Sequence, residues 1–432
     1  IDLFNASTPL EPPTTVDTPN ALYTYVADRV RDRHARESAF KIYDHYLSWY
    51  WEQRIARIEI IDTVGRNGGT TVTFNYTTLA RLNPAEFRAF YLGQNTVADY
   101  YFNVIADLES TSVSAIPGET DYNYTATVSS YIPGNRPLQV GDRMEIEISQ
   151  FLLAPRNGRP NYYGTAILYI VGEGIVPWEG VGGNLDSYPL PTNAWLGGQT
   201  TVHYQYSDEP QHLFKQMAGN IAPTNGQPFM LGRRLHHTDF GNGVHSEPNN
   251  PVFSEQIGKL GPGFIARSCV ECHVNNGRAL PPAIGEDMFK TVMKVGTDAN
   301  GTPHPTLGSV LQPQNTSGPA EGSATIASYT LSNGQYGDGT PYELRDPVYS
   351  FNGTTPSNYS ARLAPSLVGM GLLEAISESS VMALADPGDA DQNGISGRAQ
   401  MVTDPETGQA RLGRFGYKGA RARVSHQVAG AL

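Results

Sequence analysis

The chain contains only two cysteines, and they lie three residues apart in Cys269-Val270-Glu271-Cys272-His273. A fold stabilised by disulfides needs cysteine pairs spread along the chain, so these thiols form either a redox pair or an anchor for a cofactor. The histidine that follows favours the anchor. Cys-x-x-Cys-His is the attachment signature of c-type haem, in which both thiols form thioethers with the porphyrin and the imidazole becomes the proximal iron ligand.

A thioredoxin-like pair and a zinc site are the alternatives at this motif. A thioredoxin-like pair would begin a helix in a βαβ unit, and the sequence around Cys269 shows no such unit. Zinc would need two further ligands, and the chain has no other cysteine. We therefore expect one covalent haem c held by Cys269, Cys272 and His273, with His273 bound to the iron. Haem attachment predicts a periplasmic or secreted protein, and a first residue that is Ile rather than Met fits a processed chain.

Composition narrows the choice of partners. The formal net charge is -12, and an acidic surface repels a phosphate backbone, which argues against nucleic acid. An acidic surface suits a basic redox partner, although many exported proteins are simply acidic. The sequence has no run of about 18 apolar residues, so we expect no membrane-spanning helix.

The first part of the chain, residues 1–205, is predicted to be an α+β domain with a mainly antiparallel sheet. Hydrophobic spacing predicts helices over residues 19–59 and 84–109, after an extended arm at residues 1–17. Alternating or continuous apolar runs predict strands at residues 57–60, 71–74, 144–148 and 166–171. No catalytic motif is recognised in this domain.

The second part, residues 206–432, is expected to be a mainly helical, cytochrome-c-like haem domain with long loops. It is rich in Pro, Gly and Asn, and short helical segments are predicted at residues 286–294 and 366–385. This combination of long loops and short helices fits a domain in which the cofactor supplies much of the core.

The flanks of the haem motif and three later stretches resemble the di-haem oxidoreductase family, which is related to bacterial di-haem cytochrome c peroxidases. The resemblance covers about residues 229–432, so the first domain lies outside it. It is carried by residues 231–235, 261–264, 267–282, 364–376, 389–398, 412–418 and 427–431.

This resemblance implies a peroxidase-type haem oxidoreductase. Peroxide would bind iron opposite His273, an acid–base group would move a proton between its oxygens, and electrons would come from a second haem or from a partner protein. Two departures from the family are visible. The family's second Cys-x-x-Cys-His does not occur before Leu432, so we expect it in a C-terminal fragment or in another cytochrome that replaces it. A glutamate position of the peroxidase relatives aligns with His426, beside Gln427, and both residues become catalytic candidates.

Three further residues are candidates for the haem pocket. Met370 lies in a Gly-flanked loop that enters an apolar helix, and it could be the sixth iron ligand or a core residue. A neutral His426 could also bind iron. Arg278 follows the motif by five residues, and its guanidinium would match a haem propionate.

Two other clusters could hold metals. Asp389, Asp391 and Asn393, followed by Gly394, match the first half of a calcium loop, but Gln400 replaces the glutamate of an EF-hand. Calcium binding and an Asx-rich turn are both open there. Five residues near the haem motif could bind a transition metal, but we favour hydrogen bonding within a loop; they are His236, His237, Asp239, His245 and Glu247.

Two non-peroxidase functions stay open. The chain could be a mono-haem electron-transfer cytochrome that docks an electron donor or acceptor protein, or a non-catalytic component of a redox assembly. A low-spin, six-coordinate iron at rest would favour electron transfer, and a high-spin iron would favour catalysis.

Overall fold

A computed structural model describes residues 14–29, 48–54, 56–91, 101–158, 160, 164–176, 178–180, 187–189, 193, 215, 225–248 and 250–432. The chain divides into two compact units. Unit 1 comprises Ile1–Arg234 and Glu247–Asn250, and unit 2 comprises Leu235–Ser246 and Pro251–Leu432. Among the described residues, no helix combines the length and the apolar character needed to cross a membrane.

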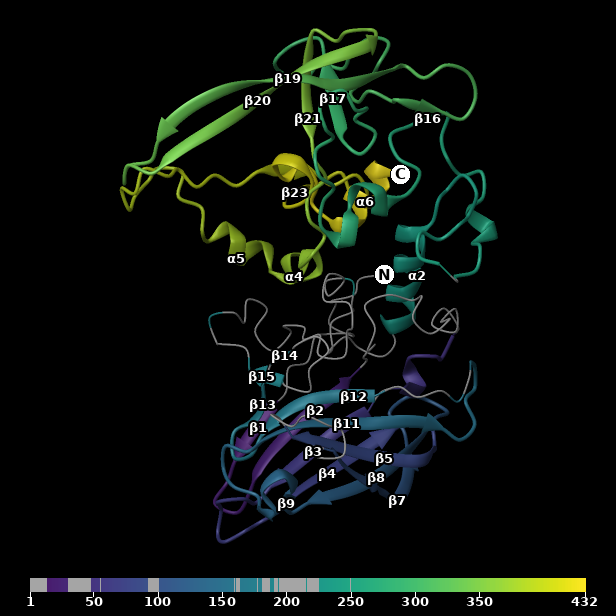
Figure 1. Ribbon diagram of the computed structural model, residues 1–432, viewed down its shortest axis with the longest axis vertical. Coiled ribbons are helices and arrows are strands. Elements are labelled where there is room, and N and C mark those ends of the chain that lie inside the picture. Colours follow the sequence, from purple (N-terminus) through teal and green to yellow (C-terminus); the bar gives the residue numbers. More distant parts are fainter. Residues whose placement is uncertain are drawn as a thin grey trace. The chain divides into compact units, whose positions relative to one another are not determined.

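Unit 1 is built around two antiparallel sheets (Figure 1). One sheet has the strand order β1-β2-β3-β4-β8-β7 and the other β13-β12-β11-β5-β6. The strands of the first are β1 (Thr14–Asp17), β2 (Leu22–Arg29), β3 (Ala56–Asp62), β4 (Val72–Thr78), β7 (Asp107–Val113) and β8 (Thr120–Val128). Those of the second are β5 (Leu82–Tyr91), β6 (Tyr101–Ile105), β11 (Arg143–Leu152), β12 (Gly164–Ile170) and β13 (Gly174–Val176).

Smaller elements complete unit 1. They are η3 (Glu52–Arg54), β9 (Ser130–Tyr131), η4 (Ile132–Gly134), β10 (Arg136–Pro137), β14 (Trp178–Gly180), β15 (Ser187–Pro189) and most of α2 (Gly226–His237).

Alternating side chains from the two sheets form one core. The ring of Phe74 on β4 lies 4.7 Å from Phe87 on β5 and 5.8 Å from Tyr169 on β12, measured between centroids. The strands predicted at residues 57–60, 71–74, 144–148 and 166–171 are confirmed by β3, β4, β11 and β12.

The helices predicted in the first part are wrong over most of the described residues, although the short 3-10 helix η3 lies within residues 19–59. On β2 the buried residues are Leu22, Thr24 and Val26, with a period of two, so the helical spacing from Tyr23 was coincidental. Residues 84–109 contribute to β5, β6 and β7 instead, because Ala85, Phe87 and Ala89 alternate into the core. Residues 1–13 and 30–47 of the predicted arm and helix lie outside the described residues.

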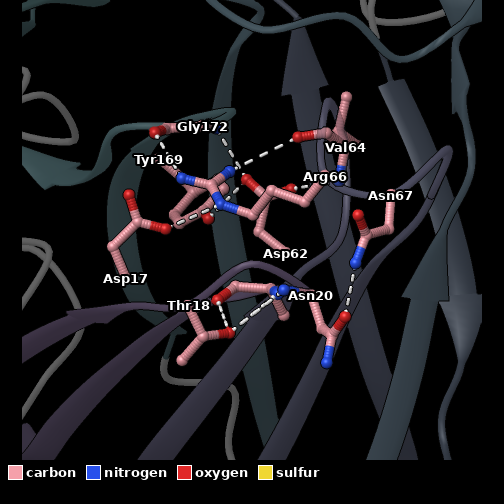
Figure 2. A network of polar contacts seen from close by, with 10 residues as sticks. Asp17, Thr18, Asn20, Asp62, Val64, Arg66, Asn67, Tyr169 and Gly172 are labelled. Atoms are coloured by element: carbon pink, nitrogen blue, oxygen red, sulfur yellow. Dashed lines mark hydrogen bonds and ion pairs between the residues drawn. The ribbon is translucent and has the colours of Figure 1, made fainter.

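A polar network joins three turns at one end of this core (Figure 2). The fully buried Asp62 accepts hydrogen bonds from the backbone of Val64 at 2.8 Å, from Gly172 at 2.7 Å and from the hydroxyl of Tyr169 at 2.8 Å. Arg66 donates to Asp17 at 2.8 Å, which brings in the turn before β2. The network therefore ties both sheets together.

Unit 2 is made of short hairpins and short helices. It contains η9 (Ser254–Gln256), β16 (Gly263–Phe264), α3 (Cys269–Cys272), η10 (Val274–Asn276), β17 (Val292–Gly296), β18 (Gln314–Asn315), β19 (Gly322–Gln335), β20 (Pro341–Gly353), β21 (Asn358–Arg362), α4 (Met370–Ala375), α5 (Glu378–Met382), β22 (Met401–Thr403), β23 (Ala410–Leu412), η11 (Tyr417–Gly419) and α6 (Val424–Ala431). The predicted mainly helical domain is therefore wrong. Residues 366–385 do hold α4 and α5, but residues 286–294 lead into strand β17.

The core of unit 2 packs around the root of the β19–β20 hairpin, the long ribbon in Figure 1. Ala324 and Ile326 of β19 are buried with Met293 and Val295 of β17. The distal half is exposed, with Leu331 at 55% and Leu344 at 59%. Strands thus supply this core, in a domain that was expected to be mainly helical.

Candidate functional site

The Cys-x-x-Cys-His motif forms one helical turn. Cys269–Cys272 is α3, and the amide of His273 donates to the carbonyl of Cys269 at 3.0 Å. Asn275 and Asn276 then take positive φ angles of 53° and 60°, which turns the chain sharply. A single turn brings both thiols and the imidazole to one short segment, as attachment of one cofactor requires.

No disulfide joins the two thiols, and their surroundings disfavour ionisation. Burial raises the pKa of Cys269, and burial together with Glu271 raises the pKa of Cys272 to about 11. A thioredoxin-like nucleophile needs a lowered thiol pKa, so the environment does not suit that alternative.

The ring of His273 is oriented by a residue far along the chain. Its Nδ1 lies 2.9 Å from the carbonyl oxygen of Pro365. Because a carbonyl only accepts, Nδ1 carries the proton and Nε2 keeps its lone pair, as in histidines that bind metals. Burial lowers the pKa of His273, although the hydrogen bond to Pro365 opposes the shift, so the neutral ring is favoured.

The segment around Pro365 is fastened to the haem motif. The amide of Leu367 donates to the carbonyl of Asn276 at 2.7 Å, and the hydroxyl of Ser366 donates to the same oxygen at 3.3 Å. Tyr417 lies close enough to Cys272 for its pKa to be raised, first by burial and then by that thiol. Residues 364–376 and 412–418, which carried the family resemblance, thus border the motif.

Further polar contacts fix this border. The side chain of Arg414 donates to the carbonyls of Leu373 at 3.0 Å and Ile376 at 2.6 Å, at the C-terminal end of α4. The carboxylate of Glu374 accepts from the amide of Val424 at 3.0 Å, at the start of α6. The motif, α4 and α6 are therefore linked by one chain of contacts.

The apolar side chains near the motif fit a porphyrin. Leu280 is 86% exposed, and Val368 and Leu372, close to Pro365, are also exposed. Helix α4 has the sequence MGLLEA but no buried residue. Two thiols, an oriented imidazole and an apolar surface are together the donor set and surroundings that a c-type haem needs.

His426 is the buried residue of α6, with 6% exposure. Its Nε2 lies 3.3 Å from a carboxylate oxygen of Glu406, and Asp404 completes a group of three possible metal ligands. Asp404 is surrounded by cations, since Arg411 lies at 3.9 Å and Arg423 at 3.8 Å. The polar contact of His426 is thus with Glu406 and not with the haem motif.

The remaining haem-pocket candidates sit around the same segments. Gln427 follows His426, and its side chain touches Gly416, where a Cβ would collide with it. Met370 begins α4 and is half-buried. Arg278 is exposed.

In the candidate calcium loop, a third carboxylate, that of Asp386, joins the two predicted from the sequence. Asp386, Asp389 and Asp391 can bring one oxygen each within 4.8 Å of the others. Asn393 instead donates to Asp391 at 2.8 Å. Asp386 was missed by the sequence analysis, although it lies only three residues before Asp389.

The residues of the histidine-rich loop make several hydrogen bonds and ring contacts. Asp239 accepts from Arg267 at 2.8 Å, and Nδ1 of His237 lies 2.7 Å from the hydroxyl of Ser246. The rings of His237 and His245 stack at 5.0 Å. Glu247 pairs with Lys215 at 3.0 Å within unit 1.

Fold and site together define a two-unit protein whose second unit presents a Cys-x-x-Cys-His turn on an apolar surface. Residues 308–432 match the family model described as "Di-haem oxidoreductase, putative peroxidase". The match confirms the family resemblance over that segment and supports a peroxidase-like oxidoreductase. The motif itself lies outside the matched residues. No curated protein and no solved structure matches the chain.

Proposed function

We propose that the chain is an extracytoplasmic c-type haem oxidoreductase that reduces a peroxide or oxidises a partner. The observation that carries this proposal is the hydrogen bond between His273 and Pro365, because it leaves the Nε2 of a half-buried imidazole ready for a metal beside two thiols. The location in the periplasm or outside the cell follows from thioether attachment.

Different residues of the chain would attach the haem, bind its iron and orient the iron ligand. Cys269 and Cys272 would hold the haem, and His273 would bind its iron. When bound, the haem would supply electron exchange and peroxide activation. The Pro365 carbonyl fixes the tautomer and direction of His273, and such a partner raises the basicity of the ligand.

His426 is proposed as the acid–base group. A carboxylate accepts hydrogen bonds only, so its contact with Glu406 places the proton on Nε2 and leaves the lone pair on Nδ1. Nδ1 is buried and has no hydrogen-bond partner within the described residues. It can therefore take a proton from a bound peroxide and return it, while Gln427 donates or accepts beside it.

Calcium is proposed as a second cofactor. Asp386, Asp389 and Asp391 offer carboxylate oxygens, which are the ligands that calcium prefers. The ion would offset the repulsion among these three carboxylates and rigidify the loop.

A mono-haem electron-transfer cytochrome is the second candidate. The observation that favours it is the contact of His426 with Glu406, because this contact is made with a carboxylate and not with His273. A partner cytochrome or a C-terminal fragment would then supply or receive the electrons.

One experiment tests the proposal. The protein exported to a periplasm should give a pyridine haemochrome spectrum of haem c, and it should consume hydrogen peroxide with a reduced cytochrome as donor. Haem c without peroxide consumption would support the electron-transfer function instead. A purified, folded protein without haem c would overturn both.

A further inference from the structure

The β19–β20 ribbon of unit 2 has two long edges, and they differ in how well they are protected against a further strand (Figure 1). At the root of β19 the outer edge is covered, since Ile284 bridges Ile326 and Asp287 bridges Thr325. That cover ends at Ile326, where a register shift marks a bulge at Ala327. Beyond the bulge, β19 and β20 pair only with each other among the residues that the structure describes.

The hydrogen bond at the tip of the ribbon determines which backbone groups face outward. The amide of Tyr336 donates to the carbonyl of Thr340 at 2.9 Å, so these two residues form a hydrogen-bonded pair. Hydrogen-bonded and non-hydrogen-bonded pairs alternate along an antiparallel ribbon, and the residues of a non-hydrogen-bonded pair direct their N–H and C=O groups away from each other. Counted back from the tip, the pairs that direct these groups outward are Gln335–Pro341, Asn333–Glu343, Leu331–Arg345 and Tyr329–Pro347.

The edge formed by β20 is protected. Pro341 and Pro347 occupy two of its outward positions, and proline has no N–H to donate. The other two outward positions hold the charged and exposed residues Glu343 and Arg345. Natural sheets prevent further pairing at their edges with prolines and charges of this kind.

The edge formed by β19 has no such protection. Its outward positions each offer one N–H and one C=O, and they are held by Tyr329, Leu331, Asn333 and Gln335. β19 contains neither a charged residue nor a proline, although 17% of the chain's residues are charged. Leu331 is 55% exposed on this strand. An open, uncharged edge of this kind accepts another strand.

We propose that β19 pairs antiparallel with β19 of a second copy of this chain, which joins the two ribbons into one four-stranded sheet. The formal net charge of -12 opposes association of two copies, and an uncharged strand adds no repulsion at the contact. A two-fold axis presents the same strand in opposite directions, so the pair is antiparallel by symmetry. Residues that pair across the axis lie on one face of the joined sheet, so Tyr329 and Leu331 of both copies share a face.

The protected edge limits this association to two copies. In the joined sheet both outermost strands are β20, whose prolines and charges prevent another strand from adding. Pairing along one strand is also a small contact compared with the ~1,600 Å² of total surface that a standard protein–protein interface buries. We therefore expect a dimer that forms as the concentration rises, and not a fibre or a permanent assembly.

Sedimentation velocity of the purified full chain should show a monomer–dimer equilibrium that shifts with concentration. Asn333→Pro removes one outward amide of β19 and leaves the β19–β20 hydrogen bonds in place, as Pro347 does on β20, so it should dissociate the dimer. Glu343→Pro is the matched control, because it removes the outward amide of the same pair on the protected edge and should leave the dimer unchanged.

An added charge gives an independent test. Leu331→Lys places two like charges near each other in the joined sheet, so it should weaken dimerisation by roughly tenfold at low salt, and high salt should recover part of that loss. Leu344→Lys puts the same charge on β20, where Leu344 is 59% exposed, and should leave the dissociation constant unchanged. An unchanged circular dichroism spectrum shows that each variant has folded. If Asn333→Pro does not fold, the two lysine variants decide.

Three results would overturn the inference. They are a wild-type chain that stays monomeric at every concentration, a dimer that survives Asn333→Pro and Leu331→Lys alike, and a dimer that Glu343→Pro dissociates. A monomer whose Leu331 and Asn333 amides resist hydrogen exchange would assign the edge to another occupant, and it would overturn the inference as well. The haem content plays no part in these measurements, so loss of the dimer would leave the proposed function in place.

Discussion

Nε2 of His426 and Oε1 of Glu406 lie 3.3 Å apart, with the imidazole buried and the carboxylate side chain 60% exposed. The pair joins helix α6 to the turn between β22 and β23. A buried base held by an exposed acid keeps its direction while solvent still reaches the acid.

His426→Ala should lower peroxide turnover by roughly 10²–10⁴-fold, as expected for loss of an acid–base group. Glu406→Gln should cause a smaller loss, because the side chain only orients His426. Steady-state kinetics with a reduced cytochrome donor would measure both, with the exposed Ser425→Ala as the control. Unchanged turnover in His426→Ala would remove the residue from the mechanism.

Covalent attachment predicts that haem stays with the polypeptide in a denaturing gel stained for haem. Cys269→Ala combined with Cys272→Ala should abolish the stain, because no thioether can form. Extraction of the haem of the wild-type protein into acidic organic solvent would contradict attachment.

Bound calcium should stabilise the protein by mass action, by about 2.7 kcal/mol when its concentration is 100 times Kd. A chelator should therefore lower the melting temperature of the wild type, and Asp389→Asn should remove that response. Asp338→Asn alters another exposed turn, in which Asp338 accepts from Thr340, and should keep the response. Identical melting with and without chelator, and no calcium in elemental analysis, would count against the site.

The ionisation of Asp404 should make the stability of the folded protein depend on pH, in a direction that its pKa shift defines. Burial opposes its ionisation, but hydrogen bonds from the amides of Glu406 and Thr407, with the charges of His426 and Arg423, hold its pKa below 3.8. A carboxyl whose pKa is lower in the folded state stabilises above the unfolded pKa, and this stabilisation is lost as pH falls through the folded pKa.

Asp404→Asn should therefore melt earlier than the wild type at pH 7, and the difference should shrink below about pH 4. Circular dichroism melts between pH 7 and pH 2 would measure it. The exposed Glu343→Gln on the hairpin should follow the wild-type curve. A difference that is constant across this range would show that the effect is not electrostatic.

In unit 1, Asp62→Ala should lower the free energy of unfolding by on the order of 3 kcal/mol, since it leaves the Tyr169 hydroxyl and two amides without their acceptor. Denaturant unfolding would measure the loss. Asn67→Ala, at the exposed edge of the same network, should change stability far less. Equal losses would show that the network does not centre on Asp62.

The strands with strict alternation could be predicted from sequence, as β3 and β11 show. The segment from Leu82 was misread because Pro84 resembles a helix start, whereas pairing with β11 holds it in a sheet. The β19–β20 hairpin was missed although Asp338-Gly339 between two runs rich in Thr, Ser and Tyr is a turn signal.

At the site, the motif of Cys269, Cys272 and His273 could be predicted from the sequence because its residues lie close together along the chain. The partner of His273 was not, because Pro365 acts through a backbone carbonyl 92 residues away and carbonyls carry no sequence signature. Glu406 was missed for a related reason, since the turn that presents it to His426 exists only after β22 and β23 pair.

The β19–β20 ribbon also bears on how chains of this kind can diverge. Its root carries Ala324 and Ile326 into the core, while its distal pairs, such as Leu331 with Arg345, lie outside that core. Paired insertions or deletions in the distal half would leave the core intact, because the residues that they displace lie outside it. An odd step would turn the side chains between it and the tip to the opposite face of the ribbon. The length of this ribbon is therefore free to vary without loss of the core, and the parity of the change decides which side chains the two faces near its tip present.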